Sequence, residues 1–150
     1  MSDLVSNKKA RFDYELLDQY EAGIELTGRE VKSLKNGQGS LLGAHIIIRG
    51  GEAFLVGTTI PPYQPANNAD TYDPARPRRV LLTKKELATL AGQEKTKGLT
   101  IVPLSVYSKG KKVKLRLAVV KGKKKYDKRE TLKKKDAKRE IERTLKREYR

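Results

Sequence analysis

The side chains that most often carry out catalysis are scarce in this sequence. His45 is the single histidine, and there is no cysteine among the 150 residues. A nucleophilic triad, or a metal site rich in histidine or thiolate, therefore lacks its parts. Asp70 and Asp73 could hold Mg²⁺, but aspartates close to prolines more often form turns. We expect a protein that binds rather than catalyses, with no metal and no cofactor.

Cationic side chains give the stronger chemical signal. Lysine and arginine number 34 against 18 acidic residues, which gives a formal net charge of +16. Such an excess attracts a polyanion through counterion release and long-range steering. Part of it lies on one predicted strand, beside two tyrosines whose rings could stack on bases: Lys112, Lys114, Arg116, Tyr107 and Tyr126. These features predict nucleic-acid binding, and they distinguish RNA from DNA only weakly.

An anionic membrane is the other polyanionic partner to consider. No apolar run approaches the roughly 18–20 residues that a spanning helix needs. The first residues, 2–6, are too short and polar for the core of a signal peptide. The lack of cysteine also fits a reducing compartment. We expect a cytoplasmic protein with no membrane partner.

Apolar residues recur at every second position over residues 12–26, which predicts a long strand, or two strands joined at a bend, with one buried face. Gly23 suits a bulge or a close backbone approach. Thr27 and Glu30 have the spacing of a capping box, so a helix should cover residues 28–36. Thr83 and Glu86 repeat that spacing, and Gly92 should end the second helix.

The other segments predict more strands and one long loop. Residues 42–60 should form a hairpin around Gly50 and Gly51, and residues 99–107 and 113–119 two further strands, with Pro103 at an edge or bulge. Residues 61–79 hold five of the six prolines and should be an irregular basic loop, because they include Arg76, Arg78 and Arg79. The fold class is thus mainly β, an OB-like antiparallel barrel with short inserted helices.

Both ends of the chain are strongly basic. We expect a basic arm over residues 1–11, the barrel over 12–126, and a basic tail over 127–150. Residues 121–150 contain 15 cationic and 6 acidic residues, or +9 of the total charge. Four apolar residues spaced by four form only a narrow helical stripe: Ala137, Ile141, Leu145 and Tyr149. Such a stripe buries too little surface to order the chain, so the tail should be disordered when free and helical against a partner.

Several separated strings resemble the bacterial small protein B (SsrA-binding protein) family. They are NKKARFDYELLDQYEAGIELTGREVKSLKNG, IPPY, DPARPRRVLLTKKEL, KGLTIVPLSVY and KGKKKYDKRETLKKKDAKRE, which cover nearly the whole chain in order. The resemblance implies an OB-like barrel that grips the tRNA-like domain of tmRNA and brings it to stalled ribosomes. It also implies that the tail occupies the empty decoding site and mRNA channel, against 16S rRNA. We expect the free protein to be a monomer.

By matching positions, the resemblance implies tmRNA contacts at Asn7, Lys8, Glu30, Lys32, Lys35, Lys121 and Lys124. The neighbouring basic residues and one tyrosine complete the expected RNA-binding set: Lys9, Lys123, Lys125 and Tyr126. Asp127, Lys128 and Arg129 match the motif associated with the decoding site, and we expect Lys133 and Lys134 of the tail to act with them. The family pattern is not matched everywhere: Arg29, Gln38, Tyr72 and Thr83 stand where other residues are common.

The sequence leaves two possible roles for each of two residues, and a second possible function for the whole chain. Glu30 is either a helix cap or an RNA contact, and the two roles are compatible. Tyr126 is either a stacking platform or an anchor that packs the start of the tail onto the barrel. The main alternative function is that of a ribosomal or ribosome-assembly protein that binds rRNA.

Overall fold

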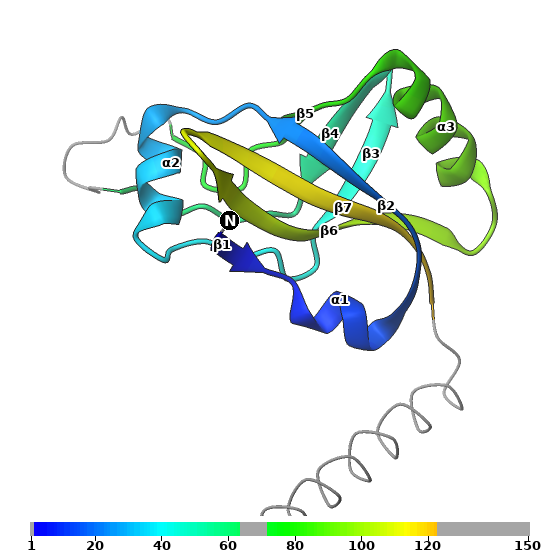
Figure 1. The fold of residues 1–150 in the computed structure, drawn as a ribbon, viewed down its shortest axis with the longest axis horizontal. Helices are drawn as coiled ribbons and strands as arrows, with labels where there is room; N and C mark the ends of the chain where they lie inside the picture. The colour runs from blue at the N-terminus through cyan, green and yellow to red at the C-terminus, as the bar shows by residue number, and fades with distance from the viewer. Residues whose placement is uncertain (1, 64–71, 123–150) are drawn as a thin grey trace, which may run out of the picture.

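Residues 2–63 and 72–122 are described by the computed structural model, and they form one curved sheet flanked by short helices (Figure 1). The elements follow in the order β1 Ser2–Ser6, α1 Lys8–Asp13, β2 Tyr14–Ile24, α2 Gly28–Lys35, β3 His45–Arg49, β4 Glu52–Val56, β5 Arg78–Leu81, α3 Lys84–Lys95, β6 Leu99–Lys109 and β7 Lys112–Gly122. Every strand pair is antiparallel. The expected class, mainly antiparallel β with short helices, is confirmed.

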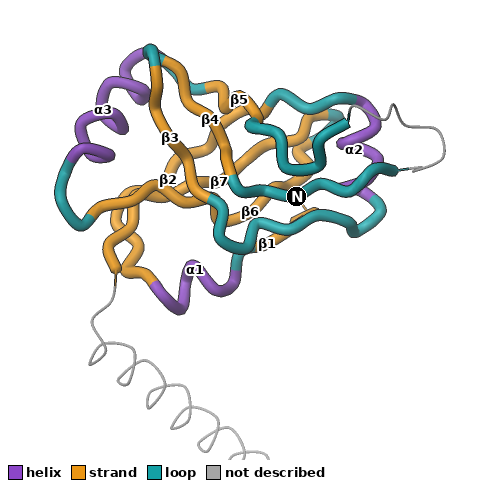
Figure 2. The backbone as a smooth tube through the Cα atoms, turned by 180° about the vertical axis from the view of Figure 1, so that it is seen from behind, coloured by secondary structure: helices purple, strands orange, loops and turns teal. Residues whose placement is uncertain are grey.

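The order of the strands across the sheet is β1-β6-β7-β2-β5-β4-β3. The sheet bends back over itself, so that β3, at one end of this order, contacts β6 near the other end (Figure 2). Gly23 sits where β2 passes from one neighbour to another, since it pairs with both Lys114 of β7 and Leu81 of β5. A Cβ at Gly23 would lie 3.2 Å from the Cβ of Leu81, so the expected close approach is present.

The central strand β7 is buried on both faces because its side chains alternate between two apolar clusters. The odd-numbered residues of 115–119 enter the main cluster, and Ala118 and Val120 enter a smaller one. The main cluster also receives Leu34 of α2 and Leu90 of α3, whereas Ala10 of α1 closes the smaller cluster. The short helices therefore cover surfaces that the sheet alone would leave exposed.

Bulges allow side chains from a single strand to pack into both apolar clusters. The register of β2 against β7 shifts between Leu16 and Gln19. Leu16 packs against the smaller cluster, whereas Tyr20 and Ala22, at the same parity, belong to the main one. The register of β6 shifts after Pro103, which confirms the expected bulge. The expectation of a single buried face along residues 12–26 is therefore wrong, since an extra residue in a strand exchanges its faces.

The structure also changes several expected boundaries. The segment expected as a basic arm folds instead, because β1 pairs with β6 and residues 8–13 form α1. The helix expected to end at Gly92 continues to Lys95. The basic loop ends at Arg78, where β5 begins. In contrast, both capping boxes form, and Gly50 and Gly51 turn the β3–β4 hairpin with φ of 59° and 74°.

Candidate nucleic-acid interface

Asn7 fixes α1 to the bulged part of β6. Its Oδ1 accepts from the N–H of Ala10 at 3.2 Å, and its Nδ2 donates to the carbonyl of Pro103 at 2.9 Å. Its own backbone N–H donates to the carbonyl of Leu104 at 2.8 Å. Asn7 is 7 % exposed, so it holds the helix rather than projecting from it.

The cations that follow Asn7 point outward. Lys8, Lys9 and Arg11 are exposed on α1. The C-terminal end of β7 lies beside this helix, because Tyr14, directly after α1, pairs with Gly122. Exposed Lys121 pairs across the sheet with Glu15 and is one residue from that point. Residues more than a hundred positions apart in sequence therefore gather at one end of the sheet (Figure 1).

The second group of cations lies on α2. Lys32 and Lys35 are exposed in the last turn of the helix, where positive charge is favoured by the helix dipole. The Lys32 Nζ lies 5.9 Å from the centre of the Tyr63 ring, within the range of a cation–π contact. Strand β1 touches α2 and leads directly into α1, so it connects the two cationic helices.

Glu30, which precedes these lysines on α2, is not at the surface. It is 1 % exposed, and its Oε1 accepts from the N–H of Thr27 at 2.9 Å, as a capping box requires. Arg76 donates to both carboxylate oxygens, and Arg78 donates to Oε2 through Nε at 2.9 Å and Nη2 at 2.7 Å. The expectation of a helix cap is confirmed. A direct contact with RNA does not fit this burial, because neither oxygen faces solvent.

Arg78 is the partner that makes the burial of Glu30 possible. Its side chain is fully buried, and Nη1 donates to the carbonyls of Thr58 at 3.1 Å and Arg76 at 2.9 Å. Nη2 also donates to the carbonyl of Pro74 at 2.9 Å. The guanidinium therefore ties α2, the segment before β5 and the end of β4 into one unit. A buried charge is tolerated only when it is paired and hydrogen-bonded in this way.

The pairing determines the protonation state of Glu30. Burial by itself raises the pKa of this carboxyl group. The hydrogen bonds from Arg76, the Thr27 N–H and Arg78 outweigh burial and lower the pKa to about 2. Burial raises the pKa of the neighbouring Tyr72, whose hydroxyl lies 2.8 Å from the carbonyl of Ile60. Glu30 is therefore an anion and Tyr72 a neutral phenol at neutral pH.

The Glu30–Arg76–Arg78 ion cluster was missed from the sequence, where the arginines were assigned to a basic loop. A signal was present: Arg78 has the parity of Val80, which is buried in β5. An arginine on the buried parity of a strand needs an internal carboxylate. Strand alternation alone does not say which one, because Glu30 lies 48 positions away.

Not all expected basic and aromatic residues form an open surface. Tyr107 is 1 % exposed, and the guanidinium carbon of Arg116 lies 5.0 Å from its ring centre, so Tyr107 has no free face for a base. Lys109 is paired with Glu21 at 3.1 Å. The remaining expected site residues lie outside the described residues: Lys123, Lys124, Lys125, Tyr126, Asp127, Lys128, Arg129, Lys133 and Lys134.

The described residues hold two further findings about possible partners. No group of three or more potential metal ligands gathers within residues 2–63 and 72–122. None of the helices in that part of the chain is long and apolar enough to cross a bilayer.

Comparison of the sequence with known protein families shows which family the chain belongs to. The family model described as SmpB protein matches residues 4–147. The chain belongs to the SmpB family. The SsrA-binding protein of Sulfurihydrogenibium sp. (strain YO3AOP1) is 52 % identical over 143 residues, which cover 95 % of this chain and 93 % of that protein. The SsrA-binding protein of Thermosipho africanus (strain TCF52B) is 48 % identical over 98 % of this chain and 99 % of its own.

A solved structure extends the similarity to three dimensions. One chain of the structure described as "tmRNA-SmpB: a journey to the center of the bacterial ribosome" is 42 % identical. It matches with a TM-score of 0.67 over 80 % of this chain and 84 % of that chain. The fold of this SmpB-family chain is therefore the one seen in that structure.

Proposed function

We propose that this chain binds the tRNA-like domain of tmRNA and delivers it to stalled ribosomes for trans-translation. The observation that carries the proposal is the similarity to SsrA-binding proteins, which extends over nearly the full length of the chain. The net charge of +16 supports a nucleic-acid partner independently. The protein acts in the cytoplasm as a monomeric binding factor and carries out no catalysis.

We assign tmRNA recognition to the exposed cations of the two helices that β1 connects, here called the α1–α2 basic surface: Lys8, Lys9, Arg11, Lys32 and Lys35. We assign Lys121, at the end of β7, to the same recognition, together with Lys123, Lys124 and Lys125 of the sequence. Asn7 and Glu30 act beneath it, because Asn7 fixes α1 to β6 and the ion cluster fixes α2 to the segment before β5. Held cations bind phosphates with less loss of side-chain and backbone freedom.

We assign the ribosomal role to the tail. Its cationic charge suits the RNA walls of the decoding region and the mRNA channel, and five of its residues are proposed to engage 16S rRNA: Asp127, Lys128, Arg129, Lys133 and Lys134. The barrel and the tail would then divide the work, with the barrel holding tmRNA and the tail occupying the position of the missing mRNA.

The test is a pull-down with the full chain from a bacterial lysate, followed by sequencing of the bound RNA. Two charge-matched variants sharpen it: Lys8, Lys9 and Arg11 to Ala on α1, and Lys84, Lys85 and Lys95 to Ala on α3, where all six side chains are exposed. Wild type and the α3 variant should enrich tmRNA, and the α1 variant should lose it. Enrichment of rRNA alone would instead support a ribosomal or assembly protein.

A further inference from the structure

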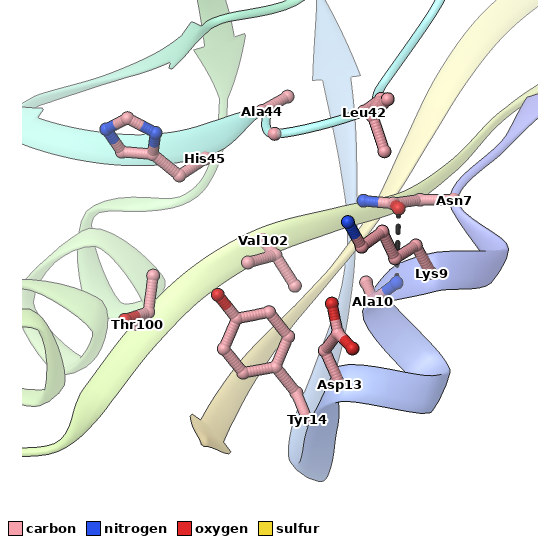
Figure 3. Close-up of a pocket in the computed structure, with 11 residues that line it drawn as sticks. Asn7, Lys9, Ala10, Asp13, Tyr14, Leu42, Ala44, His45, Thr100 and Val102 are labelled. Atoms are coloured by element: carbon pink, nitrogen blue, oxygen red, sulfur yellow. Dashed lines mark hydrogen bonds between the residues drawn. The ribbon is translucent and has the colours of Figure 1, made fainter. Parts of the chain in front are cut away.

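A cavity of about 280 Å³ lies between α1, the turn before β3 and strand β6. Figure 3 shows Tyr14 and Val102 on one side and Leu42 and Ala44 on the other. The cavity is at the small end of the range for ligand sites and is large enough for one planar ring system. Of the exposed cations on α1, Lys9 lines this cavity.

Leu42 is exposed at the rim of this cavity. The alternation of residues 42–48 predicts a buried Leu42, but β3 begins only at His45 and Leu42 is 64 % exposed. It is the most exposed of the large apolar side chains in the described residues. An exposed leucine opposite the Tyr14 ring, across a small cavity, suits a flat apolar ligand face.

The polar groups of the cavity select among planar ligands. Lys9 and Asp13 lie one turn apart on α1, and Figure 3 shows the ammonium and the carboxylate both directed into the cavity. A carboxylate offers two adjacent acceptor oxygens, and guanine is the RNA base with two adjacent donors, N1–H and the N2 amino group. The guanine O6, next to these donors, can accept from the Lys9 ammonium.

We propose that this cavity binds one unstacked guanine of the RNA partner, with its Watson–Crick edge on Asp13 and Lys9 and its face between Tyr14 and Leu42. The inference rests on the proposed function and adds a base-specific contact to it. Unpaired RNA loops supply such bases, because their nucleotides can leave the stack and enter protein pockets.

The sign of one charge change separates this proposal from general electrostatics. Asp13→Asn raises the net charge by one, so simple phosphate attraction should tighten RNA binding slightly. Loss of the guanine contact should weaken binding roughly tenfold. Glu15→Gln is the matched control, because it makes the same charge change at an exposed position nearby that does not line the cavity. A neutral side chain at the C-terminal end of α1 is favoured by the helix dipole, so Asp13→Asn should fold.

The experiment uses the full chain and an in vitro transcript of a tRNA-like domain of tmRNA. Kethoxal, which modifies guanine at N1 and N2, is applied with and without protein beside a filter-binding titration. The expected result is one loop guanine that wild type and Glu15→Gln protect and Asp13→Asn exposes. Inosine at that guanine, which lacks the N2 amino group, should weaken binding to wild type and leave Asp13→Asn unchanged.

Two results overturn the proposal in different ways. If wild type binds the transcript but no unpaired guanine is protected, or protection is the same in Asp13→Asn, the guanine site is wrong and the proposed function stands. If wild type does not bind the transcript at all, the proposed function fails, and the guanine site fails with it.

Discussion

Replacing Glu30 by Gln should lower the free energy of unfolding by far more than the loss of a helix-capping interaction would. Gln keeps the size of the side chain and can still serve in a capping box. It removes the only charge that balances the buried guanidinium of Arg78 within the Glu30–Arg76–Arg78 ion cluster. Breaking a buried pair in this way costs about 3–5 kcal/mol, because the remaining charge is left without its partner.

The chain contains its own control for this change. Glu86 occupies the same position in the capping box of α3, where its carboxylate accepts hydrogen bonds from the N–H and the hydroxyl of Thr83. Since Glu86 caps without a buried arginine, Glu86→Gln should cost less than about 1 kcal/mol. Urea unfolding followed by circular dichroism measures both values. Equal losses in the two variants would show that the ion cluster adds nothing beyond the cap.

A comparison of wild type with Glu30→Gln at different pH values tests the pKa of Glu30. The folded value of about 2 lies below the ordinary 4.5, so the stabilisation by ionised Glu30 is complete above about pH 4.5. It is lost as the pH falls from about 4.5 toward 2, and the shift corresponds to about 3 kcal/mol. The stability difference between wild type and Glu30→Gln should therefore shrink from pH 5 downward. A difference that stays constant down to pH 3 would refute the assigned pKa.

Three further predictions concern RNA binding, decoding and packing. If the α1–α2 basic surface meets roughly 5–8 phosphates, tmRNA affinity should fall by orders of magnitude between low and moderate salt, and a nearly flat log–log plot from filter binding would contradict this. Changing Asp127, Lys128 and Arg129 together to Ala lowers the net charge by only one. Such a variant should bind tmRNA normally but lose tagging of stalled peptides, so normal tagging would exclude the decoding role. Gly23→Ala should cost on the order of 1 kcal/mol in urea unfolding because its Cβ would press on Leu81, whereas Gly28→Ala, in open space, should be nearly neutral.

Local chemistry made much of the fold predictable. Both capping boxes, the Gly50–Gly51 hairpin and the β7 alternation depend on neighbours within a few residues, and all are present. The bulges of β2 and β6 could be suspected only at Asp18, which interrupts the apolar parity, and at Pro103. The exchange of faces that they cause depends on a second cluster, which no single strand pattern contains.

The misses required information from distant parts of the chain. The first residues were expected to form a basic arm because they include Lys8, Lys9 and Arg11. They are folded because β6, about a hundred positions later, offers Leu104 and Pro103 as partners for Asn7. Arg78 was expected in a loop because its charge outweighed its strand parity. In both cases the structure of the segment depends on a contact with a residue far away in the sequence, which a local sequence pattern cannot predict.

The order of strands also bears on how the protein is made. Strand β1 is the first to be synthesised, but its sheet neighbour β6 ends only at Lys109. During translation, therefore, β1 and the α1 cations have no template until most of the chain exists, and closing so long a loop is entropically slow. The α1 cations should therefore gain the support of a paired β1 only after Lys109 has been made, so tight binding of structured RNA should appear late in synthesis.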